Sequence, residues 1–460
     1  MKKKHLIIIG IIVLGTITIL SLYQTFALGG DITKDTSGYY NVTVTDGTTV
    51  NVPAGSGKTV YYKLTNINKG VVQYGVGYSG TNITVKYYSD TQDPAAGTVD
   101  YGKSKFIKLY IENTGSASST AELSTILGYE KGGDLIVPSG VTLVTKALTM
   151  SDLITNLYNK SIKTNVTNNS ITYQYDTTHN LMKDVGDNIR YYGADPNNYI
   201  YFNCSDYINQ TSDTCEKWRI IGVFNDKVKL IRGSQIGRYS WDNKNVSTGA
   251  EDSNGKNDWS DARLMKLLNL GYESETTGGS LYYNAKSGNC YSGINNATIT
   301  CNFTNTGIKN NITRNLISDT TYYLGGWDNN SVYANQIYEY ERGIKVYAGR
   351  PTEWKGKIAL PYPSDYGYAA DLEKCTMRLD SYNKSTCISN NWMKTIVNSG
   401  WLLTPRSAQS GIAWDVYGEG FAIYQGTGYA YGVVPVLYLN SELSIKSGAG
   451  SNSDPYQLDV

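Results

Sequence analysis

The amino-acid sequence predicts a mainly β protein whose first part is all β and whose larger second part is α+β. Tyr is very abundant and only 10 of the 460 residues are Pro, a composition that favours strands joined by polar turns. Apolar residues alternate over residues 31–137, whereas residues 187–445 combine strands with short helical stripes. A chain of this length has room for two or three domains that each bury a core.

The N-terminal sequence is typical of an export signal. Three lysines at 2–4 precede an apolar segment at 6–22, and positive charge before such a segment keeps that end in the cytoplasm. The segment is long for the core of a signal peptide and short for a membrane span. Residues 1–30 are therefore interpreted as a signal peptide or an N-terminal membrane anchor. Both alternatives place the rest of the chain outside the cell, either secreted or on the extracellular face of the cell membrane.

Residues 31–137 predict an immunoglobulin-like β-sandwich. Residues 41–45 and 48–52 flank Asp46-Gly47, which is a strong signal for a two-residue hairpin. Further alternating segments follow at the short spacing typical of such a sandwich. They lie at 60–64, 72–78, 83–87, 107–111 and 121–123.

One stretch of this region resembles a phosphate-binding loop. Gly57-Lys58-Thr59 ends like that motif, but Val52 stands where the motif requires its first Gly. An alternating strand follows where the motif needs a helix, so we interpret residues 55–57 as a turn and expect no nucleotide. The formal net charge of +1 provides no basic surface, so no nucleic-acid partner is expected either.

Residues 138–186 predict a linker with one short helix. Thr149 and Asp152 have the spacing of a capping box, and an apolar helical stripe follows at 153–158. Residues 165–170 are polar and patternless, which is typical of a linker.

Residues 218–231 predict the central hairpin of the second part. Two apolar strands flank Asn225-Asp226, which suits a two-residue turn. Because both faces of the first strand are apolar, we expect the hairpin to be the buried floor of the domain. A ligand site is then expected in the loops after Tyr239 and the aromatic run before Val433. Helices are expected at 259–269, capped by 257–261, and at 308–318, with later strands at 357–360, 401–403, 421–424 and 433–439.

The six cysteines form three couples separated by eleven or twelve positions: Cys204 and Cys215, Cys290 and Cys301, Cys375 and Cys387. Six cysteines allow fifteen pairings. The regular couples favour three local disulfides, and an exported chain meets an oxidising environment. A metal site is the alternative, but the couples lack C-x-x-C spacing and nearby histidine.

Several motifs in the second part resemble those of a known group. They are 218–224, the helix at 259–269, Tyr340-Glu341-Arg342-Gly343, 360–369, 401–405 and 432–439. These motifs are similar to uncharacterised exported or surface proteins of low-GC Gram-positive bacteria. The C-terminal domain of that group is remotely similar to the C-type-lectin-like fold of formylglycine-generating enzymes. The resemblance implies a disulfide-stapled C-type-lectin-like α+β domain at 187–445, followed by a C-terminal tail at 446–460.

The sequence departs from that group in two places. Val434 stands where the last strand of the group has an Arg, so no role of that Arg carries over. Formylglycine-generating enzymes need a reactive cysteine pair near the end of the domain, and no cysteine follows Cys387. The resemblance therefore implies the fold and not that catalytic activity.

Catalytic constellations are scarce in the sequence. The chain has 2 His, at positions 5 and 179, so Ser-His-Asp triads and histidine-rich zinc sites are not expected. A carboxylate pair for glycoside cleavage leaves no spacing signature, although solvated loop charges are the commoner explanation for such residues. The available carboxylates are Glu339, Glu341, Asp365, Asp415 and Glu419.

Aromatic residues beside Asp and Asn are the candidates for ligand binding. In Trp241-Asp242 and Trp327-Asp328-Asn329, polar oxygens beside a ring suit a calcium ion with a sugar stacked on the ring. The alternative is a core tryptophan followed by turn-forming residues. A final group of candidates includes Trp414 and Tyr424 from the aromatic run before Val433. Such rings suit the binding of sugars or peptides, but packing between strands also explains them. The members of this group are Asp365, Tyr366, Trp414, Asp415 and Tyr424.

These observations predict a non-enzymatic ligand-binding or adhesion module at the cell surface that recognises a glycan or a protein. Membrane contact is expected only through the N-terminal segment, and no cofactor is expected except calcium. Two alternatives stay open. One is an exported enzyme that acts on envelope polysaccharide through a carboxylate pair, and the other is a structural component of the cell envelope.

Overall fold

A computed structural model describes residues 28–34, 40–44, 49–67, 69–87, 93–128, 135, 137–243, 255–294 and 296–460. The apolar segment at 6–22 lies outside these residues, and none of the helices in the described ranges is long and apolar enough to cross a membrane. The chain divides into two compact units, Met1–Ala147 and Leu148–Val460. Strands make up 39% and helices 11%, so the fold is mainly β, as predicted.

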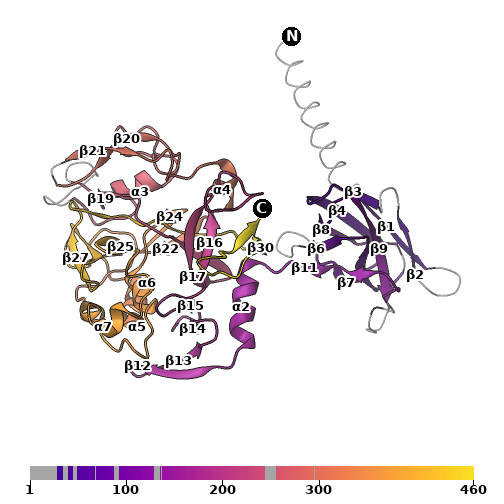
Figure 1. Ribbon diagram of the computed structural model, residues 1–460, viewed down its shortest axis with the longest axis horizontal. Helices are drawn as coiled ribbons and strands as arrows, with labels where there is room; N and C mark the ends of the chain where they lie inside the picture. Colours follow the sequence, from indigo (N-terminus) through magenta and orange to yellow (C-terminus); the bar gives the residue numbers. More distant parts are fainter. Residues whose placement is uncertain are drawn as a thin grey trace, which may run out of the picture. The chain divides into compact units, whose positions relative to one another are not determined.

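The strands of the first unit (Figure 1) form two sheets. The two sheets share one apolar core. One sheet has the order β11-β6-β8-β4-β1-β2, and the other has β10-β5-β9-β3 with β7 paired to β5. Tyr62 and Leu64 of β4 and Val72 and Tyr74 of β5 are fully buried in the same cluster, so this unit is a two-layer sandwich. The bounds are β1 Leu28–Lys34, β2 Tyr40–Val44, β3 Thr49–Val52, β4 Gly57–Asn66, β5 Val72–Ser79, β6 Ile83–Tyr87, β7 Ala96–Val99, β8 Ser104–Asn113, β9 Ser119–Gly128, β10 Thr142–Leu143 and β11 Thr145–Lys146.

The predicted hairpin across Asp46-Gly47 is wrong. Both strands form, but β2 pairs with β1 in one sheet and β3 pairs with β9 in the other. A sandwich needs connections that cross between its layers, and here that requirement overrides a local turn signal. The turn itself lies outside the described residues. The interpretation of 55–57 as a turn before a strand is confirmed, since Gly55 has a φ of 59° and β4 begins at Gly57.

The second unit is built on a nine-stranded sheet with the order β12-β13-β14-β15-β17-β18-β29-β24, with β16 also paired to β17. A five-stranded sheet has the order β19-β28-β25-β26-β27, and β20-β21, β22-β23 and β30-β31 form two-stranded ribbons. The bounds are β12 Thr164–Asn168, β13 Ile171–Asp176, β14 Leu181–Lys183, β15 Ile189–Tyr191, β16 Tyr199–Phe202, β17 Glu216–Phe224, β18 Lys227–Arg232, β19 Arg238–Ser240, β20 Ser287–Tyr291, β21 Thr298–Asn302, β22 Thr320–Tyr323, β23 Glu353–Gly356, β24 Ile358–Ala359, β25 Gly400–Pro405, β26 Ile412–Val416, β27 Ala422–Gly426, β28 Ala430–Gly432, β29 Val436–Tyr438, β30 Ser444–Ser447 and β31 Gln457–Asp459.

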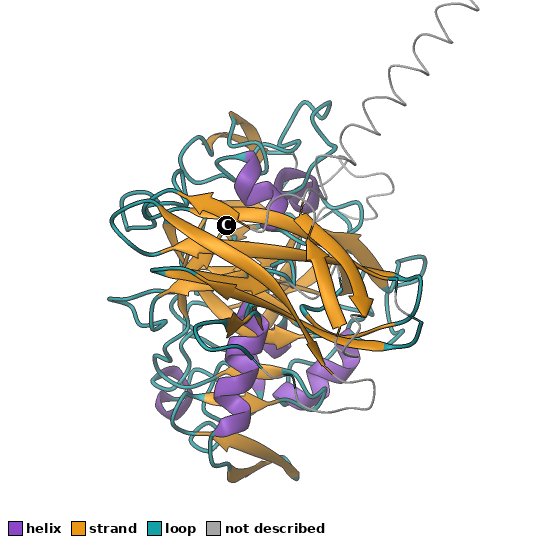
Figure 2. Cartoon of the chain, turned by 90° about the vertical axis from the view of Figure 1, so that its right-hand side faces the viewer, coloured by secondary structure: helices purple, strands orange, loops and turns teal. Residues whose placement is uncertain are grey.

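The helices are short, and strands and loops dominate the chain (Figure 2). Two form within the stretches expected to be helical, at 259–269 and 308–318, and both are shorter than expected. The bounds are α2 Met150–Lys160, α3 Arg263–Leu268, α4 Asn311–Leu316, α5 Ala334–Glu341, α6 Pro363–Tyr368 and α7 Ser385–Ile388, with a 3-10 helix, η1, at Leu379–Ser381.

The predicted central hairpin is confirmed as β17 and β18. Asn225 and Asp226 have φ values of 47° and 61°, the left-handed geometry of a two-residue turn. Residues 218–224 are all buried, with β15 paired on one side of β17 and β18 on the other. At Gly222 a Cβ atom would lie 2.1 Å from the carbonyl oxygen of Ile189, so the close approach of β15 requires glycine.

Residues 149–183 and 446–460, expected as a linker and a tail, are both part of the second unit's fold. Thr149 and Asp152 form the predicted capping box of α2, which packs against β15, β17 and β18. Residues 164–183, expected in part as a linker, form β12, β13 and β14 of the main sheet. Residues 446–460, expected as a tail, include β31, and the backbone of Tyr456 pairs with that of Ile200.

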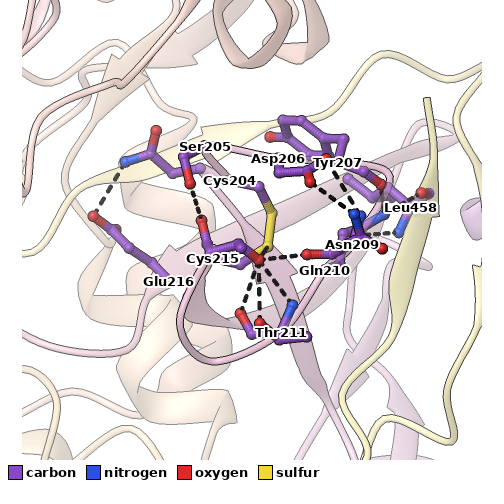
Figure 3. The surroundings of a disulfide bond; sticks show 12 residues. Cys204, Ser205, Asp206, Tyr207, Asn209, Gln210, Thr211, Cys215, Glu216 and Leu458 are labelled. Carbon is purple, nitrogen blue, oxygen red and sulfur yellow. Dashed lines mark hydrogen bonds between the residues drawn. A yellow bond between two sulfur atoms is a disulfide. The ribbon is translucent and has the colours of Figure 1, made fainter.

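All three predicted disulfides are present: Cys204–Cys215, Cys290–Cys301 and Cys375–Cys387. Figure 3 shows the first of them, which closes a loop that also holds the C-terminal strand. Gln210 Nε2 in this loop donates to the carbonyl of Leu458 at 2.6 Å, and the backbone N–H of Leu458 donates to Gln210 Oε1 at 2.9 Å. The disulfide therefore closes the loop whose Gln210 side chain binds the backbone of β31.

Candidate functional site

Trp241 and Asp242 are interior residues. Both are fully buried, and Trp241 packs edge to face against Trp259 with ring centroids 5.2 Å apart. Asp242 accepts the backbone N–H of Lys256 at 2.7 Å and that of Arg263, the first residue of α3, at 3.2 Å. The expectation that 257–261 cap this helix is wrong, because the preceding residue makes no side-chain cap bond and Asp242 supplies the acceptor.

Trp327, Asp328 and Asn329 lie nearer the surface. The half-buried Trp327 ring stacks on Tyr340 with centroids 3.7 Å apart, and Lys345 Nζ lies 4.3 Å from the centroid of the Trp327 ring. Asp328 pairs with Lys345 at 2.9 Å, and Asn329 Oδ1 accepts the backbone N–H two residues later at 2.9 Å. The faces and oxygens proposed for a sugar and an ion therefore already have protein partners.

Trp414, Asp415 and Tyr424 lie on the neighbouring strands β26 and β27. Trp414 and Asp415 are fully buried, whereas Tyr424 is half-buried with the Arg406 guanidinium 4.1 Å from its ring centroid. Neither carboxyl oxygen of Asp415 has a hydrogen-bond partner among the described residues. Burial raises the pKa of Asp415 to about 8, so this side chain is largely protonated at neutral pH.

Asp365 and Tyr366 lie on α6 and are both buried. The Asp365 carboxylate accepts from Arg190 Nη1 at 2.8 Å, Lys229 Nζ at 2.5 Å and the backbone N–H of Tyr362 at 2.9 Å. Burial favours its neutral form, but the two cations outweigh burial and hold the pKa of Asp365 below its usual value. Asp365 is thus the centre of an interior ionic network that joins β15, β18 and α6.

A pocket of about 510 Å³ adjoins this network, and Phe224, Tyr362 and Tyr438 belong to both. Each of these rings has its centroid within 5.5 Å of Lys229 Nζ, at 5.3, 4.5 and 5.5 Å respectively. The turn between β17 and β18 also lines the pocket through Asn225. The hairpin was expected to be only a buried floor; its strands are buried, but its turn borders this pocket.

The pocket combines aromatic, amide, hydroxyl and cationic groups. Its aromatic lining comprises Phe224, Tyr323, Tyr338, Tyr362 and Tyr438. Its neutral polar lining comprises Asn188, Asn225, Thr320 and Thr321, and its charged lining comprises Lys227, Asp319, Arg342 and Lys355. A cavity of this size with convergent polar groups and aromatic walls is typical of small-ligand sites.

Arg342 is the pocket cation that makes the most contacts with the protein among the described residues. Its guanidinium lies 3.4 Å from the ring centroid of Tyr338, and Nη1 donates to the Tyr338 carbonyl at 3.0 Å. Nη1 also donates to Glu341 at 3.2 Å. Burial lowers the pKa of Arg342, but Glu341, Tyr362 and Tyr338 together outweigh burial and raise it, so this cation stays charged.

Glu341 links the pocket wall to the interior network. It is fully buried and accepts the Ser364 hydroxyl at 2.5 Å and the Ser364 backbone N–H at 2.9 Å. Burial raises the pKa of Glu341 to about 7, and the nearby Asp365 carboxylate contributes. Glu341 and Asp365 are therefore the two predicted carboxylates that come together, but neither lines the pocket, and the oxygens of both are occupied by internal partners.

A second pocket, of about 430 Å³, lies beside β17 and is lined by Tyr199, Glu216 and Arg219 among others. Arg219 stacks over Tyr199 at 3.6 Å and donates to Asp195 at 3.0 Å. Arg232, which also lines this pocket, pairs with Glu216 at 2.9 Å. Its arginines are therefore already paired within the protein, unlike Lys355 of the first pocket.

Within the described ranges, no cluster of three or more His, Cys, Asp or Glu side chains is placed to hold a metal ion. Asp242 serves as a helix cap and Asp328 as the partner of a lysine, as described above. Calcium binding stays a prediction that rests on the sequence pattern alone.

The pocket residues were mostly missed by sequence reasoning. The sequence marks Tyr340-Glu341-Arg342-Gly343 as a structural motif and gives no sign that Arg342 lines a pocket. One signal for the interior network is present in the sequence: Lys229 lies between Val228 and Leu230 in a strand expected to be buried, and a buried lysine requires a partner. That partner, Asp365, lies 136 positions away, so no local pattern identifies it.

Comparison with protein-family models, with curated proteins and with solved structures found no match to this chain.

Proposed function

We propose that the protein is an exported, non-enzymatic binding module whose second unit holds part of a glycan in the pocket bordered by the β17–β18 turn, β22, β23 and α5. The observation that carries this proposal is the pocket of about 510 Å³, whose tyrosine walls stand beside amide and hydroxyl groups. Tyrosine offers a flat apolar face together with a polar hydroxyl. Sugar rings present the complementary combination of C–H faces and hydroxyl groups.

Location outside the cell is part of the proposal. Three disulfides suit an oxidising environment, and the N-terminal sequence is typical of export. We assign the first unit an immunoglobulin-like spacer role, supported by its two-layer sandwich, and the second unit a C-type-lectin-like architecture, supported by the motifs that resemble that group.

An exported enzyme with a carboxylate pair has less support. Among the described residues that line the pocket, Asp319 is the one carboxylate. Glycoside cleavage by the common mechanism uses two carboxyl groups that flank the scissile bond.

Binding of the full disulfide-bonded chain to a panel of oligosaccharides tests the proposal. Tyr323→Ala removes a half-buried ring from the pocket, and Tyr429→Ala removes a ring that is 46% exposed and does not line it. We expect Tyr323→Ala to weaken binding by at least about fivefold, the cost of losing an aromatic contact worth ~1 kcal/mol. Tyr429→Ala should leave the affinity unchanged. Binding to no member of the panel, or equal loss in both variants, contradicts the proposal.

A further inference from the structure

We infer that the pocket selects an acidic sugar, with Arg342, Lys355 and Lys227 receiving the anionic group of the ligand. The inference rests on the proposed function, because it specifies the class of glycan that this pocket takes. The anion can be a carboxylate or a phosphate, which present the same acceptor chemistry to these side chains.

The charge of the lining is unbalanced. Three cations and one carboxylate, Asp319, line the pocket. Lys357 Nζ, outside the lining, lies 3.8 Å from Asp319 and offsets that carboxylate. A cavity lined predominantly by one sign of charge attracts ligands of the opposite sign.

Lys355 is free to meet a ligand. It is exposed on β23, opposite Thr321 of β22, and both residues line the pocket. In the part of the chain that the structure describes, its ammonium group has neither an ion pair nor a hydrogen bond with the protein. Lys227 is partly engaged, since its Nζ donates to the Ser318 hydroxyl at 2.7 Å.

Arg342 is held in a fixed orientation with donors to spare. One face of the guanidinium stacks on Tyr338, and Nη1 donates both hydrogen bonds. Nε and Nη2 have no partner among the described residues. The guanidinium also lies 5.4 Å from the Tyr323 ring centroid and 5.6 Å from that of Tyr362. A planar guanidinium fixed between rings is suited to a carboxylate or phosphate.

Two buried cations behind the aromatic wall pair with two carboxylates of the interior network, so they place no net charge beside the pocket. Arg190 lies 4.6 Å from the Phe224 ring centroid, and Lys229 lies 4.5 Å from that of Tyr362. Arg190 pairs with Asp184 and Asp365, but its buried Nη2 has no partner among the described residues. One nitrogen of this buried guanidinium therefore stays unsatisfied among the described residues.

The aromatic walls distinguish a sugar from a small inorganic anion. Tyr323 and Tyr338 add ring surface next to Arg342, and Thr320 and Thr321 also line the pocket. Free phosphate would use the cations and leave these rings without a contact. An acidic sugar uses both sets of groups.

The test is calorimetric titration of the full disulfide-bonded chain with three matched ligands. These are a galacturonic-acid oligomer, the same oligomer with its carboxyl groups reduced to alcohols, and a phosphorylated neutral oligomer. Lys355→Gln removes a charge that has no protein partner, and Lys286→Gln is the control, an exposed lysine of the same unit outside the pocket. Inorganic phosphate serves as the probe for the anion alone.

We expect one or both acidic oligomers to bind at least about tenfold more tightly than the reduced oligomer, the scale of a charge-assisted hydrogen bond. Lys355→Gln should remove most of that preference, and Lys286→Gln should keep it. Which acidic oligomer binds more tightly identifies the source of the anion. Equal affinity for acidic and reduced oligomers, with no effect of Lys355→Gln, overturns the inference and leaves the proposed function standing. Failure of every oligomer to bind overturns both, as does binding of phosphate with no gain from the sugar.

Discussion

The ammonium group of Lys229 and the carboxylate of Asp365 lie 2.5 Å apart, and both side chains are completely shielded from solvent. Arg190 contacts the other oxygen of the same carboxylate at 2.8 Å. One side chain of α6 thereby pairs with two cations from two strands of the main sheet, and Asp184 supplies the second negative charge through its ion pair with Arg190. The position of α6, and with it that of Tyr362 in the pocket wall, depends on this charge arrangement.

Loss of the shared carboxylate should destabilise the second unit more than loss of one cation. Asp365→Ala leaves Arg190 and Lys229 buried with reduced compensation, so we expect the free energy of unfolding to fall by about 3–5 kcal/mol. Lys229→Met leaves Asp365 paired with Arg190 and should cost less. Denaturant titration followed by tryptophan fluorescence measures this unit alone, because all 8 Trp lie within it.

A matched control is Asp187→Asn, which removes an exposed carboxylate that faces Lys183 at 3.6 Å and keeps a residue suited to the φ of 61° at this position. It should change stability by less than about 0.5 kcal/mol. A cost for Lys229→Met as large as that for Asp365→Ala would contradict the role given to Asp365.

Glu341 should make the stability of the second unit depend on pH. Its pKa rises from 4.5 to about 7 on folding. The protonated form is therefore favoured in the folded state, and the wild-type protein loses stability as the pH rises from about 4.5 to about 7. Glu341→Gln cannot ionise, so its stability relative to wild type should increase over this range by up to about 3 kcal/mol. Denaturant titrations at several pH values, with the exposed Glu339→Gln as the control, measure the difference.

The unpartnered carboxyl of Asp415 gives a second pH signature at higher pH. Burial raises its pKa from 3.8 to about 8, so the folded state resists its ionisation and loses relative stability as the pH climbs between these values. The free energy of unfolding of Asp415→Asn, relative to that of wild type, should therefore increase across that range by up to about 5 kcal/mol. A flat difference between the two proteins from pH 4 to pH 8 would show that Asp415 has a partner in solution.

The Cys204–Cys215 bridge should protect the far C-terminal strand. Replacing both cysteines by Ala removes a local cross-link worth about 3 kcal/mol and loosens the loop that carries Gln210. Hydrogen exchange should then rise at β31. The double replacement of Cys290 and Cys301 removes a bridge of the same sequence separation, and no hydrogen bond between its loop and β31 is found in the described ranges. Exchange at β31 should stay unchanged in that variant.

The features that sequence predicted well have local causes. Asn225-Asp226 fixes the turn between β17 and β18, Thr149 and Asp152 fix the start of α2, and the regular cysteine couples fix three bridges. In each case the interacting residues lie within a dozen positions of one another, so their spacing carries the information. The hairpin across Asp46-Gly47 shows the limit of this reasoning, because sheet packing gave its strands other partners.

The pocket could not be predicted because its groups converge from distant segments. Asn188 and Tyr338, which both line the pocket and share a hydrogen bond, are separated by 150 positions, and spacing carries no information over that range. Conversely, Trp241-Asp242 looks like a binding pair in sequence, yet its oxygens are used by a nearby helix. An Asp beside a Trp indicates a ligand site only when the carboxylate oxygens do not already accept hydrogen bonds from backbone N–H groups.

The hydrogen bonds between Gln210 and Leu458 span 248 positions, and this distance has a consequence for biogenesis. In an exported chain the Cys204 loop emerges well before β31, so its sulfurs can be oxidised while the loop still lacks its partner strand. If the chain is exported as proposed, residues 457–459 leave the translocation channel after the Cys204 loop does. Under that proposal covalent closure of the loop can come first, and docking of β31 is a late step of assembly.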